Sequence, residues 1–419
     1  GDINNKNSTI HYNAVDSMAD HRSDDVFDNP LPEGIDWMNW NGYVQGQQDK
    51  MTAGALHACA LYSNSSAFCW GDNWLGALGD SSTAGVDAAQ DPTWVDLGAG
   101  RTATSMAHGG IAAHHGCAIL DNNSLSCWGW NGQGQLGLGN TTNQGAATFV
   151  DLGTGRSPVK VTLGQLHTCV LLDNNSVYCM GDNQYGQVGD GTTVDKSSPT
   201  FVDFGNGRYA VDIESGHVHT CALLDNGSIS CWGYNAYGQL GLGHTTTPVS
   251  VPTYVPLASG RHVASMAVGQ HHTCFAYDNG DVACTGRNQQ GQLGLGSTFQ
   301  TKTSLTATQS LGQPALKVVA GSYFSCAMLN NGSVRCWGDN AYGQLGSLKD
   351  KLMSKAFPVP AKDLPDGVFE QNPPRLSFTP TDAISPSRLT CFASGLGRIN
   401  FEVVGDSIEV QAPKAINSR

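Results

Sequence analysis

The fold is decided by the stretch His219-Thr220-Cys221-Ala222-Leu223-Leu224-Asp225-Asn226-Gly227-Ser228-Ile229-Ser230-Cys231-Trp232-Gly233. Five similar stretches lie elsewhere in the 419-residue chain, and successive copies are 52 to 58 residues apart. A glycine-rich tail follows each copy, as at 237–241. Self-similarity at a nearly constant period is the signature of a repeat architecture in which neighbouring units share a core.

Four short segments of strand character fill each period, and no helical periodicity competes with them. Around the quoted copy we place strands near 200–204, 209–215, 220–224 and 228–233. Four short antiparallel strands cannot bury both faces alone, so successive units must stack as blades around an axis. The sequence therefore predicts an all-β fold, a β-propeller of four-stranded antiparallel blades.

The repeated residues also resemble a known family. The pattern Gly-x-x-His-Thr-x-Ala-Leu, then Asp-Gly, Trp-Gly-x-Asn and Tyr-Gly-Gln-Leu-Gly, is similar to the regulator of chromosome condensation (RCC1-like) repeat. Six clear copies cover about 54–346, and the resemblance implies closure with seven blades, with six blades as the alternative. We divide the chain into a polar N-terminal extension, 1–34, and a single propeller, 35–419.

A seventh blade would have to come from the ends of the chain. The stretch 347–419 holds a degenerate copy, at 389–393 and 399–406, in which Phe401 stands where the second cysteine is expected. At the other end, 37–42 echoes a segment of the repeat. We therefore expect the two termini to build the closing blade jointly.

Twelve of the thirteen cysteines form six pairs with nine residues between the members, and Cys391 is the odd one. If Asp225-Asn226-Gly227 is a three-residue hairpin loop, Cys221 lies opposite Cys231. Directly opposed residues have Cα atoms about 4.5 to 5.5 Å apart, which suits a disulfide. The expected disulfides are Cys59–Cys69, Cys117–Cys127, Cys169–Cys179, Cys221–Cys231, Cys274–Cys284 and Cys326–Cys336.

The alternative for these twelve cysteines is a set of reduced, buried thiols. Paired cysteines are typical of oxidising compartments, so we expect a secreted or cell-surface protein. Within the family, such a chain looks like a secreted, disulfide-containing member of prokaryotic type.

Composition and motifs exclude several classes of function. The net charge is −13 with only 14% charged residues, which argues against binding to nucleic acid or anionic lipid. No apolar run is long enough for a membrane span. The chain has no Gly-x-Ser-x-Gly elbow, His-Glu-x-x-His pair, phosphate loop or Cys/His zinc spacing. We therefore expect no catalytic residue, no metal and no cofactor, and interpret the protein as not an enzyme.

Three sets of repeated side chains are interpreted as structural. A histidine stands two residues before five of the first cysteines, opposite a glycine that leaves room for it; a metal or pH-sensing ring is the alternative. Tryptophans after the second cysteine are expected to pack between blades. Arginines after a Gly-x-Gly segment are expected to pair with loop carboxylates or to cap carbonyls, with an anion-binding ring as the alternative. The sets are His57, His115, His167, His219 and His272; Trp70, Trp128, Trp232 and Trp337; and Arg101, Arg156, Arg208 and Arg261.

The glycine-rich loops supply the candidates for partner contact. Trp74 and Trp130 lie in these loops, and Tyr185, Tyr237 and Tyr342 extend the set along one rim. We expect a binding or extracellular structural module whose partner is a protein or a glycan, or further copies of the chain. The alternative, by resemblance to secreted propellers, is an inhibitor of an enzyme such as a β-lactamase. The family's role as a nucleotide exchange factor for a small GTPase is disfavoured by the cysteines and the negative charge.

Asn-x-Ser triplets recur at the expected hairpin tips. Two explanations stay open for them, because such triplets accept glycans in exported proteins, and because turn chemistry alone favours Asn and Ser there. The asparagines are Asn64, Asn122, Asn174, Asn226 and Asn331.

Overall fold

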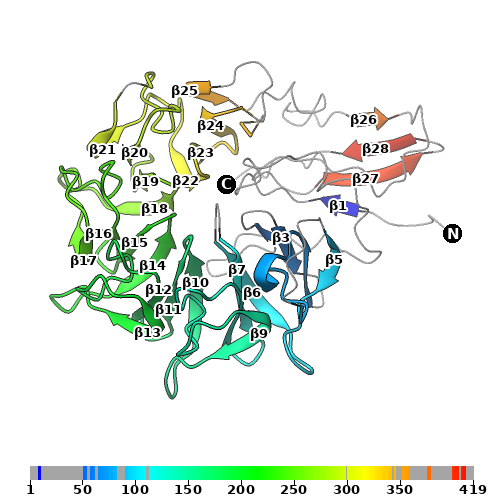
Figure 1. Ribbon diagram of the computed structural model, residues 1–419. Coiled ribbons are helices and arrows are strands. Elements are labelled where there is room, and N and C mark those ends of the chain that lie inside the picture. Colours follow the sequence, from blue (N-terminus) through cyan, green and yellow to red (C-terminus); the bar gives the residue numbers. More distant parts are fainter. Residues whose placement is uncertain are drawn as a thin grey trace.

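The computed structural model describes residues 8–10, 51–53, 57–61, 65–82, 90–109, 113–298, 300–341, 344–345, 352–358, 375–378, 399–404 and 407–411. These residues form seven four-stranded antiparallel sheets, which Figure 1 shows as blades around a central axis. The only helical element among them is a short 3-10 turn, η1 (Trp74–Gly76). None of the described segments forms a helix long and apolar enough to cross a bilayer.

Six blades follow one another along the chain, each with its strands in sequence order. Blades 1 to 3 are β2 (Met51–Ala53), β3 (His57–Leu61), β4 (Ala67–Gly71) and β5 (Gln90–Trp94); β6 (Ala103–His108), β7 (His115–Leu120), β8 (Leu125–Gly129) and β9 (Gln144–Val150); β10 (Pro158–Leu163), β11 (His167–Leu172), β12 (Val177–Gly181) and β13 (Lys196–Val202). Blades 4 to 6 are β14 (Ala210–Ser215), β15 (His219–Leu224), β16 (Ile229–Gly233) and β17 (Val249–Tyr254); β18 (Val263–Val268), β19 (His272–Tyr277), β20 (Val282–Gly286) and β21 (Lys302–Ala307); β22 (Ala315–Ala320), β23 (Phe324–Leu329), β24 (Val334–Asp339) and β25 (Leu352–Pro358).

The seventh sheet combines strands from both ends of the chain. Its order is β1 (Ser8–Ile10), β27 (Ile399–Val404), β28 (Ser407–Gln411) and β26 (Arg375–Phe378), and Ser8 is paired with Phe401. The two ends of the chain jointly supply this sheet, as expected, with its N-terminal strand within 1–34 rather than at 37–42. That the sheet closes the ring stays a prediction. The segments 37–42 and 389–393, with Cys391, lie outside the described residues.

The hairpin between β15 and β16 has the expected register. Leu224 N–H donates to the Ser228 carbonyl at 2.9 Å, and Gly227 has a φ of 75°, which a glycine adopts without strain. Counting outward, Cys221 lies opposite Cys231. All six pairs are disulfide-bonded, with Cα atoms 4.1 Å apart. This separation is shorter than expected because the alternation of the ladder places the cysteines at non-hydrogen-bonded positions, where strands approach most closely.

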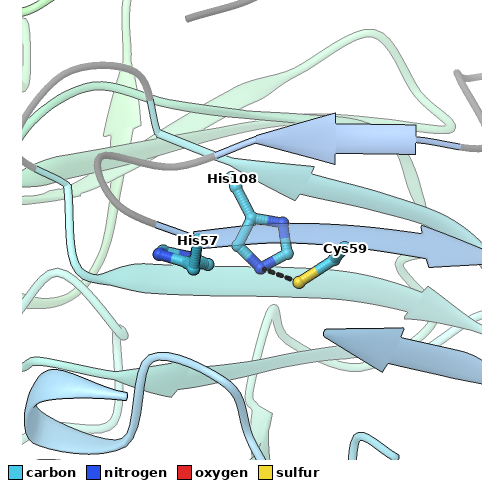
Figure 2. A group of neighbouring side chains, drawn as sticks. All are labelled: His57, Cys59 and His108. Carbon is cyan, nitrogen blue, oxygen red and sulfur yellow. Dashed lines mark hydrogen bonds between the residues drawn. The ribbon is translucent and has the colours of Figure 1, made fainter. Parts of the chain in front are cut away.

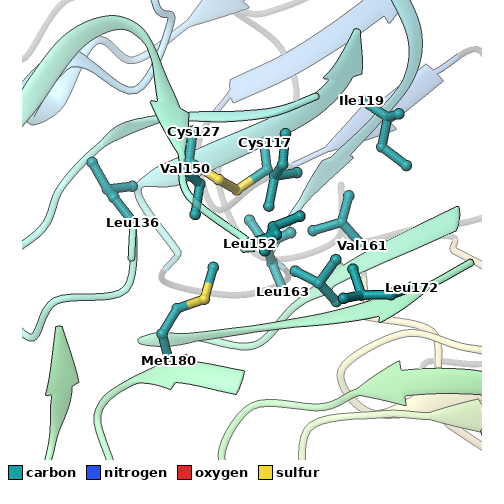
Figure 3. Packing of buried hydrophobic residues seen from close by; sticks show 12 residues of the cluster. Cys117, Ile119, Cys127, Leu136, Val150, Leu152, Val161, Leu163, Leu172 and Met180 are labelled. Carbon is teal, nitrogen blue, oxygen red and sulfur yellow. A yellow bond between two sulfur atoms is a disulfide. The ribbon is translucent and has the colours of Figure 1, made fainter. Parts of the chain in front are cut away.

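The hydrophobic core lies between the blades. Figure 3 shows the cluster in which the Cys117–Cys127 disulfide and Leu136 of blade 2 pack on Val161 and Met180 of blade 3. In blades 1 to 5 the disulfide therefore forms part of an apolar wall that the next blade covers. Such burial against neighbours explains why one blade cannot be stable alone.

Candidate functional site

The repeated histidines link neighbouring blades. Each Nε2 lies 2.8 to 3.0 Å from a hydroxyl oxygen of the following blade, in the pairs His115–Thr168, His167–Thr220, His219–Thr273 and His272–Ser325. Thr273 Oγ1 in turn donates to the Gln239 carbonyl at 2.8 Å, so the histidine must be the donor to this hydroxyl. Burial lowers the pKa of His167 to about 3 and keeps the ring neutral. The set is a series of inter-blade clamps.

Each clamp needs glycines at two places. Opposite the histidine, Gly233 has a φ of 106°, and a Cβ on it would meet the Val218 carbonyl. The imidazole of His219 itself lies against Gly216, three residues earlier, where a Cβ would come 2.7 Å from Cε1. The interpretation that the ring needs space over the cross-strand glycine is therefore wrong in detail. Gly233 allows the positive φ and the close approach of the opposite backbone, whereas Gly216 leaves room for the imidazole ring.

The tryptophans pack between blades, as expected, and the structure shows that they face the preceding blade. Trp232 Nε1 donates to the Gln187 carbonyl at 2.9 Å, and Trp337 Nε1 donates to the Gln292 carbonyl at 2.8 Å. Both side chains are fully buried. Blade 4 thus holds the next blade through His219 and the previous one through Trp232.

The first interface departs from this pattern and brings together His57, Cys59 and His108 (Figure 2). Their nitrogen and sulfur atoms all lie within 4.8 Å of one another, and His108 Nε2 is 3.2 Å from Cys59 Sγ. Blade 2 has Gly116 where later blades carry the hydroxyl residue, and a Cβ there would lie 2.3 Å from His108 Nε2. His108 therefore fills the space of the missing hydroxyl side chain.

This group does not have the donor set of a thiolate metal centre. The Cys59 sulfur is bonded to Cys69, and the metal ligand that cysteine supplies is the free thiolate. Two buried imidazoles remain, and neither nitrogen of His57 has a hydrogen-bond partner among the described residues. Sequence spacing did not indicate the group, because His108 is 49 residues from Cys59 and reaches it only across the blade interface.

A charged network spans the inner strands of blades 3 and 4. Lys160 Nζ lies 2.7 Å from Asp212 and 2.6 Å from Glu214. Burial opposes the charged form of Lys160, but the two carboxylates outweigh it and raise the pKa of the ammonium above its usual range. A lysine held charged and paired is no nucleophile, so this network links two blades rather than offering a reactive group.

The loops at one end of the blades carry two groups of contacting aromatic and histidine side chains, which together we call the aromatic face; Trp74, His114 and Trp130 form the smaller group. Rings of adjacent blades touch edge to face or tilted: Tyr185 and Tyr234 at 4.7 Å, and Tyr237 and His271 at 5.0 Å between centroids. The Arg287 guanidinium lies over Tyr237 at 5.5 Å. The members are Trp74, His114, Trp130, Tyr185, His217, Tyr234, Tyr237, His271, Arg287 and Tyr323.

Four of the five residues expected to contact a partner belong to this face. Trp74 is 41% exposed and lies 6.1 Å from Trp130, and Tyr185 reaches Tyr237 through Tyr234. Tyr342 lies outside the described residues.

Sequence reasoning missed the other six members of the aromatic face. They occupy fixed repeat positions, one residue after the glycine that ends the third strand or one to two residues before the position that holds the clamp histidine, which is Phe324 in blade 6. The residue types at these positions differ from copy to copy, whereas the rest of the repeat is nearly constant. This variation was the available sign that these positions belong to a binding surface.

The aromatic face is half-buried and preorganised. Burial lowers the pKa of His217 and of His271 to about 4, so both rings are neutral at pH 7. The positive charge of Arg287 also lowers the pKa of His271. Neutral imidazoles among tyrosines offer apolar area with hydrogen-bonding edges at a low cost in side-chain entropy, the combination that favours binding surfaces.

The opposite end of the blades carries the hairpin tips and a different chemistry. Arg208 pairs with Asp225 at 2.8 Å, and the equivalent pairs Arg101–Asp121 and Arg261–Asp278 lie at 3.3 and 3.9 Å. These are the loop carboxylates expected for the arginines. Arg156, the fourth member of the set, has no ion pair among the described residues.

The fold and the site define a class of protein. It is a propeller of tandem hairpin repeats whose blades are clamped together and whose loops carry side chains suited to binding. Two models of the regulator of chromosome condensation (RCC1) repeat match the chain, one at 124–171, 174–223, 226–276 and 279–328, the other at 159–187, 210–239, 263–292 and 316–344. Together they span more than half of the 419 residues. The chain belongs to the RCC1 repeat family.

Relatives and solved structures agree with this assignment. The ultraviolet-B receptor UVR8 of Arabidopsis thaliana is 28% identical over 374 residues, covering 88% of this chain and 81% of the receptor. The human E3 ubiquitin-protein ligase HERC2 is 29% identical over 66% of this chain, which spans only 6% of that protein.

Among solved structures, yeast RCC1 (Prp20) bound to Kap60 superposes with a TM-score of 0.66 at 19% identity, over 87% of this chain and 80% of the other. Human WBSCR16 has the same TM-score at 21% identity, over 76% and 83%. At these identities the structural likeness shows the fold alone.

Proposed function

We propose that this protein is an exported, non-catalytic propeller that binds a protein partner through its aromatic face. The larger group of the aromatic face carries the proposal, because its rings come from several blades, contact one another and are only half-buried. The yeast relative Prp20p, described with binding properties to Gsp1p and histones, supports protein binding as the general role of such propellers. The six disulfides support an oxidising, extracellular location.

Site-specific variants test the binding proposal. Tyr237→Ala and Arg287→Ala remove one ring and the cation that covers it, while Tyr209→Ala removes an exposed ring near the hairpin tips as a matched control. Partners retained from the extracellular fraction of the source organism are purified, and their Kd is measured by calorimetry with each variant. A central aromatic anchor is worth about 2 kcal/mol or more, so we expect at least a ~30-fold loss for Tyr237→Ala. An equal loss for Tyr209→Ala would contradict the proposal.

Export is tested separately by the thiol state of protein from its native source. Intact mass is measured after thiol labelling, without and with prior reduction. We expect the twelve paired cysteines to be labelled only after reduction. Their labelling without reduction would exclude an oxidising location.

Inhibition of an enzyme is the second candidate function, and the aromatic face is the feature that it requires. Titration of the pure protein into a β-lactamase assay, with Tyr237→Ala alongside, measures it directly. Stoichiometric inhibition that the variant loses would identify the partner as that enzyme. Unchanged hydrolysis at micromolar protein would exclude this candidate.

A further inference from the structure

The hairpin tips at the end opposite the aromatic face share one side-chain arrangement. In four of them an asparagine is followed two residues later by a serine whose N–H and Oγ–H both donate to the asparagine Oδ1, the hydroxyl at 2.6 to 2.7 Å. The pairs are Asn122–Ser124, Asn174–Ser176, Asn226–Ser228 and Asn331–Ser333. These asparagines are exposed, and their Nδ2 groups make no hydrogen bond to any described residue.

All four tips point to the same side of the ring. Each is tied to the start of the innermost strand of its own blade, as when Asp225 N–H donates to the Tyr209 carbonyl and Asn330 N–H to the Pro314 carbonyl. Because the blades repeat one topology, this end of every hairpin faces away from the loops that form the aromatic face.

We propose that these asparagines are N-glycosylation sites, which cover the hairpin-tip side of the propeller with glycans and leave the aromatic face bare. The inference rests on the export proposed above. The co-substrate is a sugar joined through its anomeric carbon to a phosphate leaving group. The Nδ2–C1 bond forms, the C1–O bond to phosphate breaks, and one amide proton is lost. The Oδ1 bonds of the turn survive, since only an Nδ2 hydrogen is replaced.

A hollow lies beside one tip. It has a volume of about 130 Å³ and is lined by Asn174, Ser176, Phe201, Arg208 and Tyr209, among others. The two aromatic rings are 52% and 45% exposed and offer apolar area to a group on Asn174. A sugar on Asn174 would lie against these rings with its apolar face and near the guanidinium with its hydroxyls.

The chain contains two internal controls. Blade 5 has the same exposed tip, with Asn279-Gly280-Asp281, but Asp281 replaces the serine and accepts from the Asn279 amide. On the loops of the aromatic-face side, Asn140-Thr141-Thr142 is a further triplet, but Asn140 Nδ2 donates to the Leu138 carbonyl at 3.2 Å. We expect glycans on neither asparagine.

Glycopeptide mass spectrometry of the protein from its native source tests the proposal. The expected result is added sugar mass on peptides holding Asn122, Asn174, Asn226 and Asn331, and none on Asn279 or Asn140. Unmodified tips in a protein whose cysteines are oxidised would overturn this inference and leave export intact. Sugar on Asn140 at similar occupancy would overturn the one-sided distribution.

Secretion from a glycosylating host gives a second readout. Ser228→Ala removes one acceptor triplet and keeps its asparagine, and Asp281→Ser creates a triplet on the blade 5 tip. We expect loss of one glycan in the first variant and gain of one in the second, seen as opposite shifts in intact mass. Unchanged mass in both variants would contradict the assignment of the tips as acceptors.

Discussion

The interface between blades 1 and 2 is expected to respond differently to one substitution and to a pair. Gly116→Ser places a Cβ 2.3 Å from His108 Nε2, and such overpacking of a buried site costs about 1 to 3 kcal/mol. Adding His108→Ala copies blade 6, where Ala320 accompanies Ser325. In the double variant, removal of the His108 ring makes room for the new serine side chain, whose hydroxyl can then accept a hydrogen bond from His57. The new Cβ also comes 2.8 Å from Trp128 Cε2, so the indole must shift, and blade 6 accommodates a serine and a tryptophan at the same opposed positions.

The magnitude follows from two terms. Relief of the overpacking returns about 1 to 3 kcal/mol, and a hydrogen bond to a buried, unpartnered imidazole adds about 1 kcal/mol. The two substitutions should therefore be coupled by about 2 to 4 kcal/mol in favour of the double variant. Urea unfolding of the wild type, both single variants and the double variant, followed by fluorescence and circular dichroism with disulfides intact, measures this coupling. Additivity within about 0.5 kcal/mol would refute the reasoning.

Three further predictions concern stability. Four buried histidines have pKa values of about 3 in the fold against 6.5 in an unfolded chain, so the unfolded state binds more protons between these values; they are His57, His115, His167 and His272. The free energy of unfolding is therefore highest above pH 6.5 and falls by about 1.4 kcal/mol per pH unit for each ring as the pH drops toward 3. An unchanged urea midpoint at pH 4.5 would contradict the neutrality of these rings. Trp232→Phe removes the hydrogen bond to the Gln187 carbonyl and part of a fully buried ring. We expect the free energy of unfolding in urea to fall by about 2 to 4 kcal/mol. A decrease below about 0.5 kcal/mol would show that the indole does not hold the blades together. Arg208→Ala breaks a partly exposed ion pair and should lower the free energy of unfolding by about 0.5 to 1 kcal/mol. Arg156 has no ion pair among the described residues, so Arg156→Ala serves as the control. Equal effects of the two substitutions would exclude the ion pair as the cause.

The parts of the aromatic face that sequence reasoning found and missed differ in a physical way. Trp74, Trp130, Tyr185 and Tyr237 were found because they are large aromatic residues in loops that glycines otherwise fill. His217 and His271 were missed, because they lie in a different loop and become neighbours at 5.7 Å only when two blades stand side by side.

The sequence by itself determined what one hairpin contains. A three-residue loop sets the register of the two strands that it joins, so the loop residues and the spacing were enough to place Cys221 opposite Cys231 and His219 opposite Gly233. The repeat period and the propeller class followed from the same local pattern.

Contacts between units were decided only by the tertiary structure. His57 meets His108 at 5.0 Å, and Ser8 pairs with Phe401 at the other end of the chain. No turn geometry fixes such pairs, because their separation depends on how blades pack around the axis and on the volume of every side chain between them. For the same reason the sequence did not indicate that His108 occupies the space that Gly116 leaves at one interface.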